Sequence, residues 1–93
     1  MSTKKVDGSR PDSYVPPMLT PEQCRAARGW LDWTQAELAK RANVGLSTIK
    51  DFEAGRRVPI RNNLDAMRLA LEIAGVTLTF RGERASGIEV NAP

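Results

Sequence analysis

The chain has 93 residues, the length of one small domain with short tails, and it carries a formal net charge of +3. No run of 18 apolar residues is present, so we expect no transmembrane helix, and the first 17 residues lack the apolar run of a signal peptide. A single cysteine excludes an internal disulfide and a cysteine zinc site, and the absence of histidine removes the commonest general base. We therefore expect a protein that is not an enzyme and that uses no cofactor or metal.

Residues 1–17 have the composition of a flexible arm. They hold three of the six prolines together with Ser, Gly, Asp and Lys, and too few apolar residues to join a core. We expect either a segment without a role of its own or an arm that contacts a binding partner.

Two predicted helix starts carry the same capping pattern. Thr20 is followed three residues later by Gln23, and Thr34 by Glu37, which is the spacing of a capping box. An apolar pair flanks each start in the positions of a hydrophobic staple, so we interpret Cys24 as a packing group rather than a reactive thiol. The predicted helices cover residues 21–31 and 35–42.

Apolar spacing predicts two further helices, each followed by a glycine. The first covers residues 46–54, where Ile49 and Phe52 face the same way. The second covers residues 62–74, and its apolar positions span roughly 200° of the helix circumference at about 100° per residue. So wide a face suggests a second packing partner, either the C-terminal segment or another subunit.

Beyond residue 75 the apolar period shortens to about two residues, which predicts a β-hairpin with a glycine-containing loop over residues 81–87. A lone two-stranded hairpin is marginally stable in water, so it must pack on the last helix or pair with its copy in a second chain. Its alternating apolar residues are Val76, Leu78, Phe80, Ile88 and Val90.

The two middle helices form a recognisable motif. They are short and are joined by a tight turn in which Asn43 can adopt the left-handed conformation. Leu38, Ile49 and Phe52 are apolar at spacings that bury one face of each helix, and Ala39 is small where the helices would cross. This pattern indicates a helix-turn-helix, whose second helix lies in the major groove of DNA.

The sequence resembles the Cro and phage-repressor family of XRE-type bacterial regulators from Leu19 to Val76. The strongest segment is TQAELAKRANVGLSTIKDFEAGRRVP, residues 34–59, with Asn43 where glycine is commoner and Gly45 where Ser or Thr usually caps the second helix. The resemblance implies a mainly α, lambda-repressor-like domain of four to five helices followed by the hairpin. It also implies a cytoplasmic regulator that binds double-stranded DNA. We divide the chain into an arm (1–17), a DNA-binding domain (18–75) and a hairpin with a tail (76–93).

The charge distribution agrees with this interpretation. Between Thr34 and Arg61 there are six basic and three acidic residues, whereas the rest of the chain has eight of each. The whole net charge therefore lies on the helix-turn-helix and its exit loop, where phosphates would be neutralised. The alternative is an ordinary solvated surface.

We expect base contacts from the exposed side of the second motif helix, with Lys50 preferring guanine and Asp51 accepting from cytosine. Asp51 has the alternative of pairing with a nearby basic residue. The resemblance adds Gln35, whose family counterpart holds a phosphate. The expected base contacts are Leu46, Ser47, Thr48, Lys50 and Asp51. The expected phosphate contacts are Gln35, Arg56, Arg57 and Arg61.

Other residues are expected to be structural. Arg28 and Glu53 match a family pair that forms a partly buried salt bridge between the first and third helices, the alternative being two exposed charges. Trp30 and Trp33 are interpreted as core and staple residues rather than base-stacking platforms.

The resemblance implies a homodimer, because one helix-turn-helix reads only half a site and two copies read an inverted repeat with half-sites about 34 Å apart. We expect a repressor whose hairpins pair across the two-fold axis through the apolar residues 76, 78, 80, 88 and 90, with the wide face of the last helix as another candidate contact. The alternative is an antitoxin-like or antiactivator-like module whose hairpin edge receives a partner protein, with or without DNA binding. No small-molecule substrate and no membrane are implied.

Overall fold

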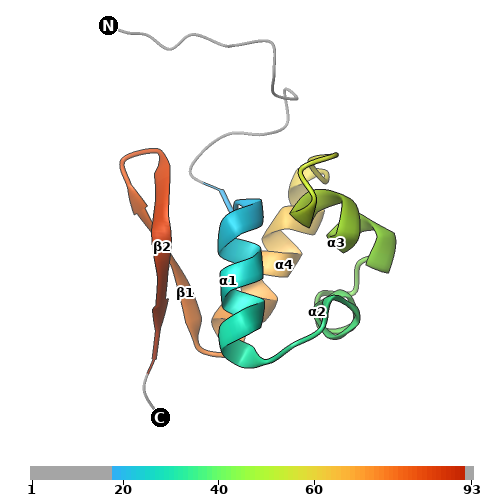
Figure 1. Ribbon diagram of the computed structural model, residues 1–93, viewed down its shortest axis with the longest axis horizontal. Coiled ribbons are helices and arrows are strands. Elements are labelled where there is room, and N and C mark those ends of the chain that lie inside the picture. The colour runs from blue at the N-terminus through green and yellow to red at the C-terminus, as the bar shows by residue number, and fades with distance from the viewer. Residues whose placement is uncertain (1–17, 92–93) are drawn as a thin grey trace, which may run out of the picture.

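The computed structural model describes residues 18–91, which form four helices followed by a two-stranded antiparallel hairpin (Figure 1). The predicted fold class is confirmed. The predicted arm lies outside the described residues, and no helix within them is long and apolar enough to cross a membrane. The elements are α1 (Pro21–Leu31), α2 (Gln35–Ala42), α3 (Leu46–Glu53), α4 (Arg61–Ile73), β1 (Val76–Arg81) and β2 (Arg84–Val90).

The helix boundaries follow the capping residues. At α1 the hydroxyl of Thr20 accepts from the Gln23 backbone N–H, and the Gln23 side chain accepts from the Thr20 N–H in return. At α2 the Thr34 hydroxyl accepts from the Glu37 N–H at 3.0 Å. Asn43 ends α2 with a φ of 58°, the left-handed conformation expected of it. α3 begins at residue 46 as predicted but ends at 53 rather than 54, and α4 covers 61–73 rather than 62–74.

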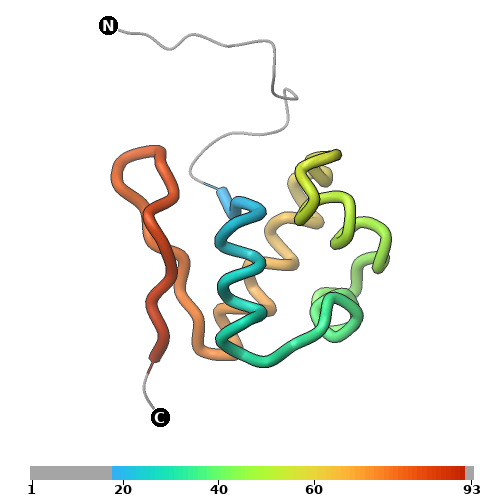
Figure 2. Tube along the Cα trace, viewed as in Figure 1, coloured from blue at the N-terminus to red at the C-terminus, as the bar shows by residue number. Residues whose placement is uncertain are grey.

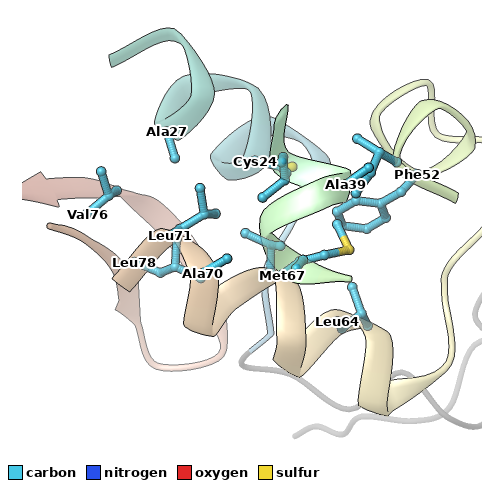
Figure 3. Packing of buried hydrophobic residues seen from close by; sticks show 14 of the residues in the cluster. Cys24, Ala27, Ala39, Phe52, Leu64, Met67, Ala70, Leu71, Val76 and Leu78 are labelled. Atoms are coloured by element: carbon cyan, nitrogen blue, oxygen red, sulfur yellow. The ribbon is translucent and has the colours of Figure 1, made fainter. Parts of the chain in front are cut away.

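One hydrophobic core joins all six elements. Figure 3 shows the sulfur end of Met67 on α4 pointing toward the ring of Phe52 on α3. Cys24 is fully buried in this core, which confirms its interpretation as a packing group. The largest side chains with less than 2% exposure are Phe52, Leu19, Leu38, Ile49, Leu64, Met67, Leu71, Val76 and Cys24.

The hairpin packs one face on the helices, with β1 against α4 and β2 against α1 (Figures 1 and 2). Its loop is only Gly82–Glu83, so β2 begins at Arg84 and not at Ile88 as the apolar alternation suggested. A glycine at the first loop position, here with φ 61°, suits the tight turn that matches strand twist. Residues 84–86 escaped prediction because they carry no apolar alternation.

The register places the apolar residues of both strands on the inner face. Val76 pairs with Val90 and Leu78 with Ile88. Val76 and Leu78 are 0% and 4% exposed, so their side chains fill the core of their own chain and have no surface left for a second chain. Of the five residues predicted at the dimer contact, only the half-buried Phe80, Ile88 and Val90 keep side-chain surface that a second chain could contact.

Gln23 fastens the hairpin to the start of α1. Its side-chain amide donates to the carbonyl oxygens of Thr79 (2.9 Å) and Gly87 (3.0 Å), which face each other across the strands. Next to this pair Ser86 is an extra residue that forms a bulge. The same glutamine thus caps a helix and donates a hydrogen bond to a backbone carbonyl of each strand. It is only 3% exposed.

Candidate nucleic-acid interface

The pair α2 and α3 is held rigid by the turn between them. The N–H of Asn43 donates to the Lys40 carbonyl and the N–H of Val44 to the Ala39 carbonyl. Leu38 of α2 and Ile49 of α3 are completely buried beneath this turn. The path of the two helices can be followed in Figure 2. A backbone fixed in this way presents the other side of α3 in one orientation.

The solvent-facing side of α3 carries the residues expected to contact bases. Ile49, Phe52 and Glu53 are buried on the opposite side, so the register of the helix is fixed. Three of the five residues are exposed and two are half-buried. Ser47 and Lys50 are exposed, Leu46 is 39% exposed, and Thr48 and Asp51 are half-buried. The structure therefore brings these five side chains together on one short helix.

A groove runs beside α3. It has a volume of about 280 Å³ and lies between the helix and its exit loop. A separate groove of about 330 Å³ lies between the start of α1 and β2. Sequence reasoning missed four residues in the wall of the groove at α3, Val58, Pro59, Ile60 and Asn63. Ile60 is 62% exposed, and a large apolar residue directly before a helix start was the available signal. The α3 groove is lined by Ser47, Thr48, Asp51, Arg57, Val58, Pro59, Ile60 and Asn63.

The basic residues of the exit loop differ in their surroundings. Arg56 donates to the Asp51 carboxylate at 3.1 Å, so the alternative in which Asp51 pairs with a nearby basic residue is the one observed. Arg61 lies 3.8 Å from Asp65, a long and exposed contact. Arg57 is exposed and takes part in no ion pair within residues 18–91. The structure thus leaves a cluster of arginines facing solvent beside α3.

Behind this surface lies a buried ionic cluster centred on Glu53. Its two carboxylate oxygens accept from the Nε and Nη2 atoms of Arg28, each at 2.7 Å, which is a two-point contact between a guanidinium and a carboxylate. The Cys24 thiol donates to the same carboxylate at 2.9 Å, and Arg25 donates to the Glu53 backbone carbonyl. Arg28 also donates to the Trp33 carbonyl, so α1, α3 and the start of α2 meet at this point.

The cluster shifts two pKa values in opposite directions. Burial alone would raise the pKa of Glu53, but hydrogen bonds from Arg28, Cys24 and Gln35 outweigh it, so this pKa lies below its ordinary value. Burial raises the pKa of the Cys24 thiol, and the hydrogen bond to Glu53 and its charge raise it further. Glu53 is therefore ionised and Cys24 is an unreactive thiol at neutral pH.

Gln35, the residue expected at a phosphate, begins α2 beside this cluster. Its side-chain amide donates to the Oε1 atom of Glu53 at 3.0 Å. A primary amide has two N–H groups, so one donor remains for a phosphate. The structure thus makes Gln35 a link between the buried carboxylate and the surface.

The two tryptophans have different environments. Trp33 is half-buried against the core, with the guanidinium of Arg41 over its ring at 4.4 Å. Trp30 is 65% exposed, so its interpretation as a core residue is wrong. It lies on the last turn of α1, at the edge of the stripe formed by the buried Gln23, Cys24 and Ala27.

Comparison with known proteins gives the family. A family model described as helix-turn-helix matches residues 25–76, more than half of the chain. The chain belongs to the XRE-type helix-turn-helix family. Among curated proteins, none matches the chain. The family match makes this protein a DNA-binding transcription regulator. The match ends at the first residue of β1, so the rest of the hairpin lies outside it.

Proposed function

We propose that this XRE-type protein is a sequence-specific repressor that reads an inverted repeat as a homodimer. The observation that carries the proposal is the division of α3 into two sides. One side is locked into the core by Ile49 and Phe52, and the other presents polar side chains to solvent. A short helix held in this way can enter the major groove with its reading residues in a fixed register.

The chemistry of the exposed side suits base edges. The ammonium of Lys50 matches the O6 and N7 acceptors of guanine, and the Ser47 hydroxyl can donate or accept. Leu46, at the N-terminal end of α3, offers an apolar surface to a thymine methyl group. Thr48 borders the groove beside these residues, within reach of a base or a phosphate.

Phosphate contacts come from the residues around α3. Arg57 and Arg61 are exposed on the loop and at the start of α4, and Arg56 adds a third guanidinium. Gln35 would contact the DNA backbone from the start of α2, where the positive end of the helix dipole adds to the attraction for a phosphate. Contacts of this kind position the protein on the duplex, whereas the α3 side chains specify the sequence.

Dimerisation follows from the limited reach of one copy. An eight-residue recognition helix covers half a site, so two copies related by a two-fold axis are needed for an inverted repeat. We place the contact at β2, because every β2 residue is exposed or half-buried and its outer edge pairs with no strand of the described chain. Pairing two β2 strands would give a four-stranded sheet. A dimer bound across a promoter in the cytoplasm would block transcription by occupying the DNA.

The test is selection of duplexes from a random library by the purified full chain at about physiological salt. An enriched inverted repeat is the expected result, and it would also supply the operator sequence. A single enriched half-site without a repeat would contradict the dimer but not the reading helix. Salt-sensitive binding without any enriched sequence would contradict the repressor proposal.

A protein partner is the second candidate function, and the same β2 edge favours it. An exposed strand can be extended by a strand from another protein. The bulge at Ser86 leaves residues 87–90 as the regular part of this edge. Capture of a partner that still binds when the arginines at positions 56, 57 and 61 are replaced would separate this role from DNA binding.

A further inference from the structure

We propose that Asp51 and Arg56 act as one unit that reads a single G·C base pair. The inference rests on the proposed function, because it requires α3 to lie in the major groove. It changes the expected role of Arg56 from a phosphate contact to a base contact that Asp51 positions.

The backbone at the end of α3 brings the two residues together. The N–H of Arg56 donates to the Asp51 carbonyl at 2.9 Å, and the N–H of Gly55 donates to the Phe52 carbonyl at 3.0 Å. This pair of bonds is a Schellman motif, which requires the left-handed conformation that Gly55 adopts with a φ of 77°. The backbone hydrogen bonds of this motif place Arg56 beside Asp51 independently of any contact between their side chains.

The side chains then complete the unit. An apolar contact usually joins these two positions of a Schellman motif, and here an ion pair takes its place, with Arg56 Nη1 donating to Asp51 Oδ1 at 3.1 Å. The Arg56 side chain is 71% exposed and that of Asp51 is 35% exposed. Asp51 also borders the α3 groove, one helical turn beyond Ser47. The pair therefore belongs to the reading surface and not to the core.

The free hydrogen-bonding groups of the pair match one base pair. After the bond between them, Arg56 keeps four of its five N–H donors and Asp51 keeps its second oxygen as an acceptor. In the major groove a G·C pair presents two adjacent acceptors, O6 and N7 of guanine, and then one donor, N4 of cytosine. Arg56 on guanine and Asp51 on cytosine would satisfy all three groups, whereas an A·T pair offers a different order of donors and acceptors.

Charge separates this unit from a phosphate contact. A carboxylate alone on the DNA-facing surface would be repelled by the phosphates, and the Arg56 guanidinium neutralises it. The pair as a whole carries no net charge, so it adds little to binding that depends only on electrostatics. Its contribution should appear as sequence preference. Arg57, which has no ion pair in residues 18–91, keeps its full charge for the DNA backbone.

The experiment is the same library selection, carried out with the full chain in five forms. These are the unchanged protein, Asp51→Asn, Arg56→Gln, the double variant, and Glu72→Gln as the control. Glu72 is an exposed carboxylate paired with an arginine on α4, remote in sequence from α3, so its replacement should leave the selected sequence unchanged. Circular dichroism confirms that each variant is folded, which is expected because exposed ion pairs contribute little to stability.

We expect the unchanged protein to select G·C at one position of each half-site. Both single variants should relax that same position by about tenfold, and the double variant should relax it no further. The double variant has the net charge of the unchanged protein, so its salt dependence should also be unchanged.

Three results would overturn the inference alone. Arg56→Gln could weaken all sequences equally, which would make Arg56 a phosphate contact. Asp51→Asn could relax a position that Arg56→Gln leaves intact, which would make Asp51 an independent reader. The shared position could select A·T. If the unchanged protein selects no sequence, the proposed function fails together with the inference, and that result is distinct from the other three.

Discussion

The side chain of Gln35 donates a hydrogen bond to the carboxylate of Glu53 at 3.0 Å, across the boundary between the protein surface and the core. Glu53 in turn is held by Arg28 from α1. A residue expected at the phosphates is thus oriented by an ion pair whose side chains are 19% (Arg28) and 3% (Glu53) exposed. Positioning of α3 and of the Gln35 side chain therefore depends on the same carboxylate.

Replacing Arg28 with Ala should be severely destabilising. The Glu53 side chain is only 3% exposed, so its carboxylate would remain buried without its charged partner. Breaking one side of a buried pair typically costs about 3–5 kcal/mol. Urea unfolding of the full chain measures the change. Arg61→Ala, which breaks a pair whose side chains are 59% and 60% exposed, is the control and should cost less than about 1 kcal/mol. Equal losses in the two variants would refute the role of burial.

Stability should fall in acid because of Glu53. Its folded-state pKa lies below the ordinary value, so its contribution is fully present above the unfolded-state pKa of about 4.3 and is lost as the pH falls through the folded-state pKa. The difference in unfolding free energy between the unchanged protein and Glu53→Gln should therefore be largest near neutral pH. It should shrink steadily below pH of about 4.3. A difference that stays constant across this range would show that ionisation of Glu53 contributes nothing.

Local patterns predicted the helices well, because a cap joins residues close in the chain. Thr20 and Gln23 are three residues apart, and both bonds of the capping box form as expected. The link from Gln23 to Thr79 and Gly87 spans 56 and 64 residues and has no signature in the sequence. What the sequence could not predict was therefore how the hairpin attaches to α1.

The same contrast applies to the candidate site. Spacing placed Ser47, Lys50 and Asp51 on one helix, and the buried side of α3 orients them as predicted. The sequence did not decide which basic residue pairs with Asp51, because that choice depends on how the chain turns at Gly55. Trp30 shows the opposite failure, since a large apolar residue was assigned to the core although it lies at the edge of the buried stripe.

Lys50 and Arg57 should affect DNA binding in different ways. Lys50→Ala should weaken binding to the selected site by about 1–3 kcal/mol and relax the preference at one base pair, because Lys50 lies on the exposed side of α3 that is proposed to contact bases. Arg57→Ala should weaken all sequences alike and lower the salt slope by about one, because one phosphate contact is lost. Fluorescence anisotropy with the selected duplex and a scrambled duplex, at several salt concentrations, distinguishes them. Two variants that lose only non-specific affinity would show that α3 is not the reader.

Gln23→Glu should loosen the hairpin selectively. The glutamate can still accept from the Thr20 N–H, but it cannot donate to the carbonyls of Thr79 and Gly87 while ionised. Leaving buried acceptors unpaired costs about 1–3 kcal/mol. Amide hydrogen exchange should accelerate in β1 and β2 more than in α2 and α3. Thr20→Ala removes the cap and leaves the hairpin bonds in place, so it should affect the start of α1 instead. Uniform acceleration in both variants would contradict the fastening role.

Sedimentation of the full chain tests the proposed dimer contact. Val90 is a half-buried residue of the strand proposed to form the contact, so Val90→Glu would place a charge from each copy in that contact and should shift the protein to a monomer. The competing surface is the apolar side of α4, where Leu69 and Ile73 are 55% and 78% exposed. Leu69→Glu with Ile73→Glu should leave the dimer intact, and circular dichroism checks that each variant is folded. A dimer that survives Val90→Glu and dissociates with the α4 variant would move the interface from the hairpin to α4. A protein that is monomeric without substitution, even at high concentration, would require DNA to bring the two copies together.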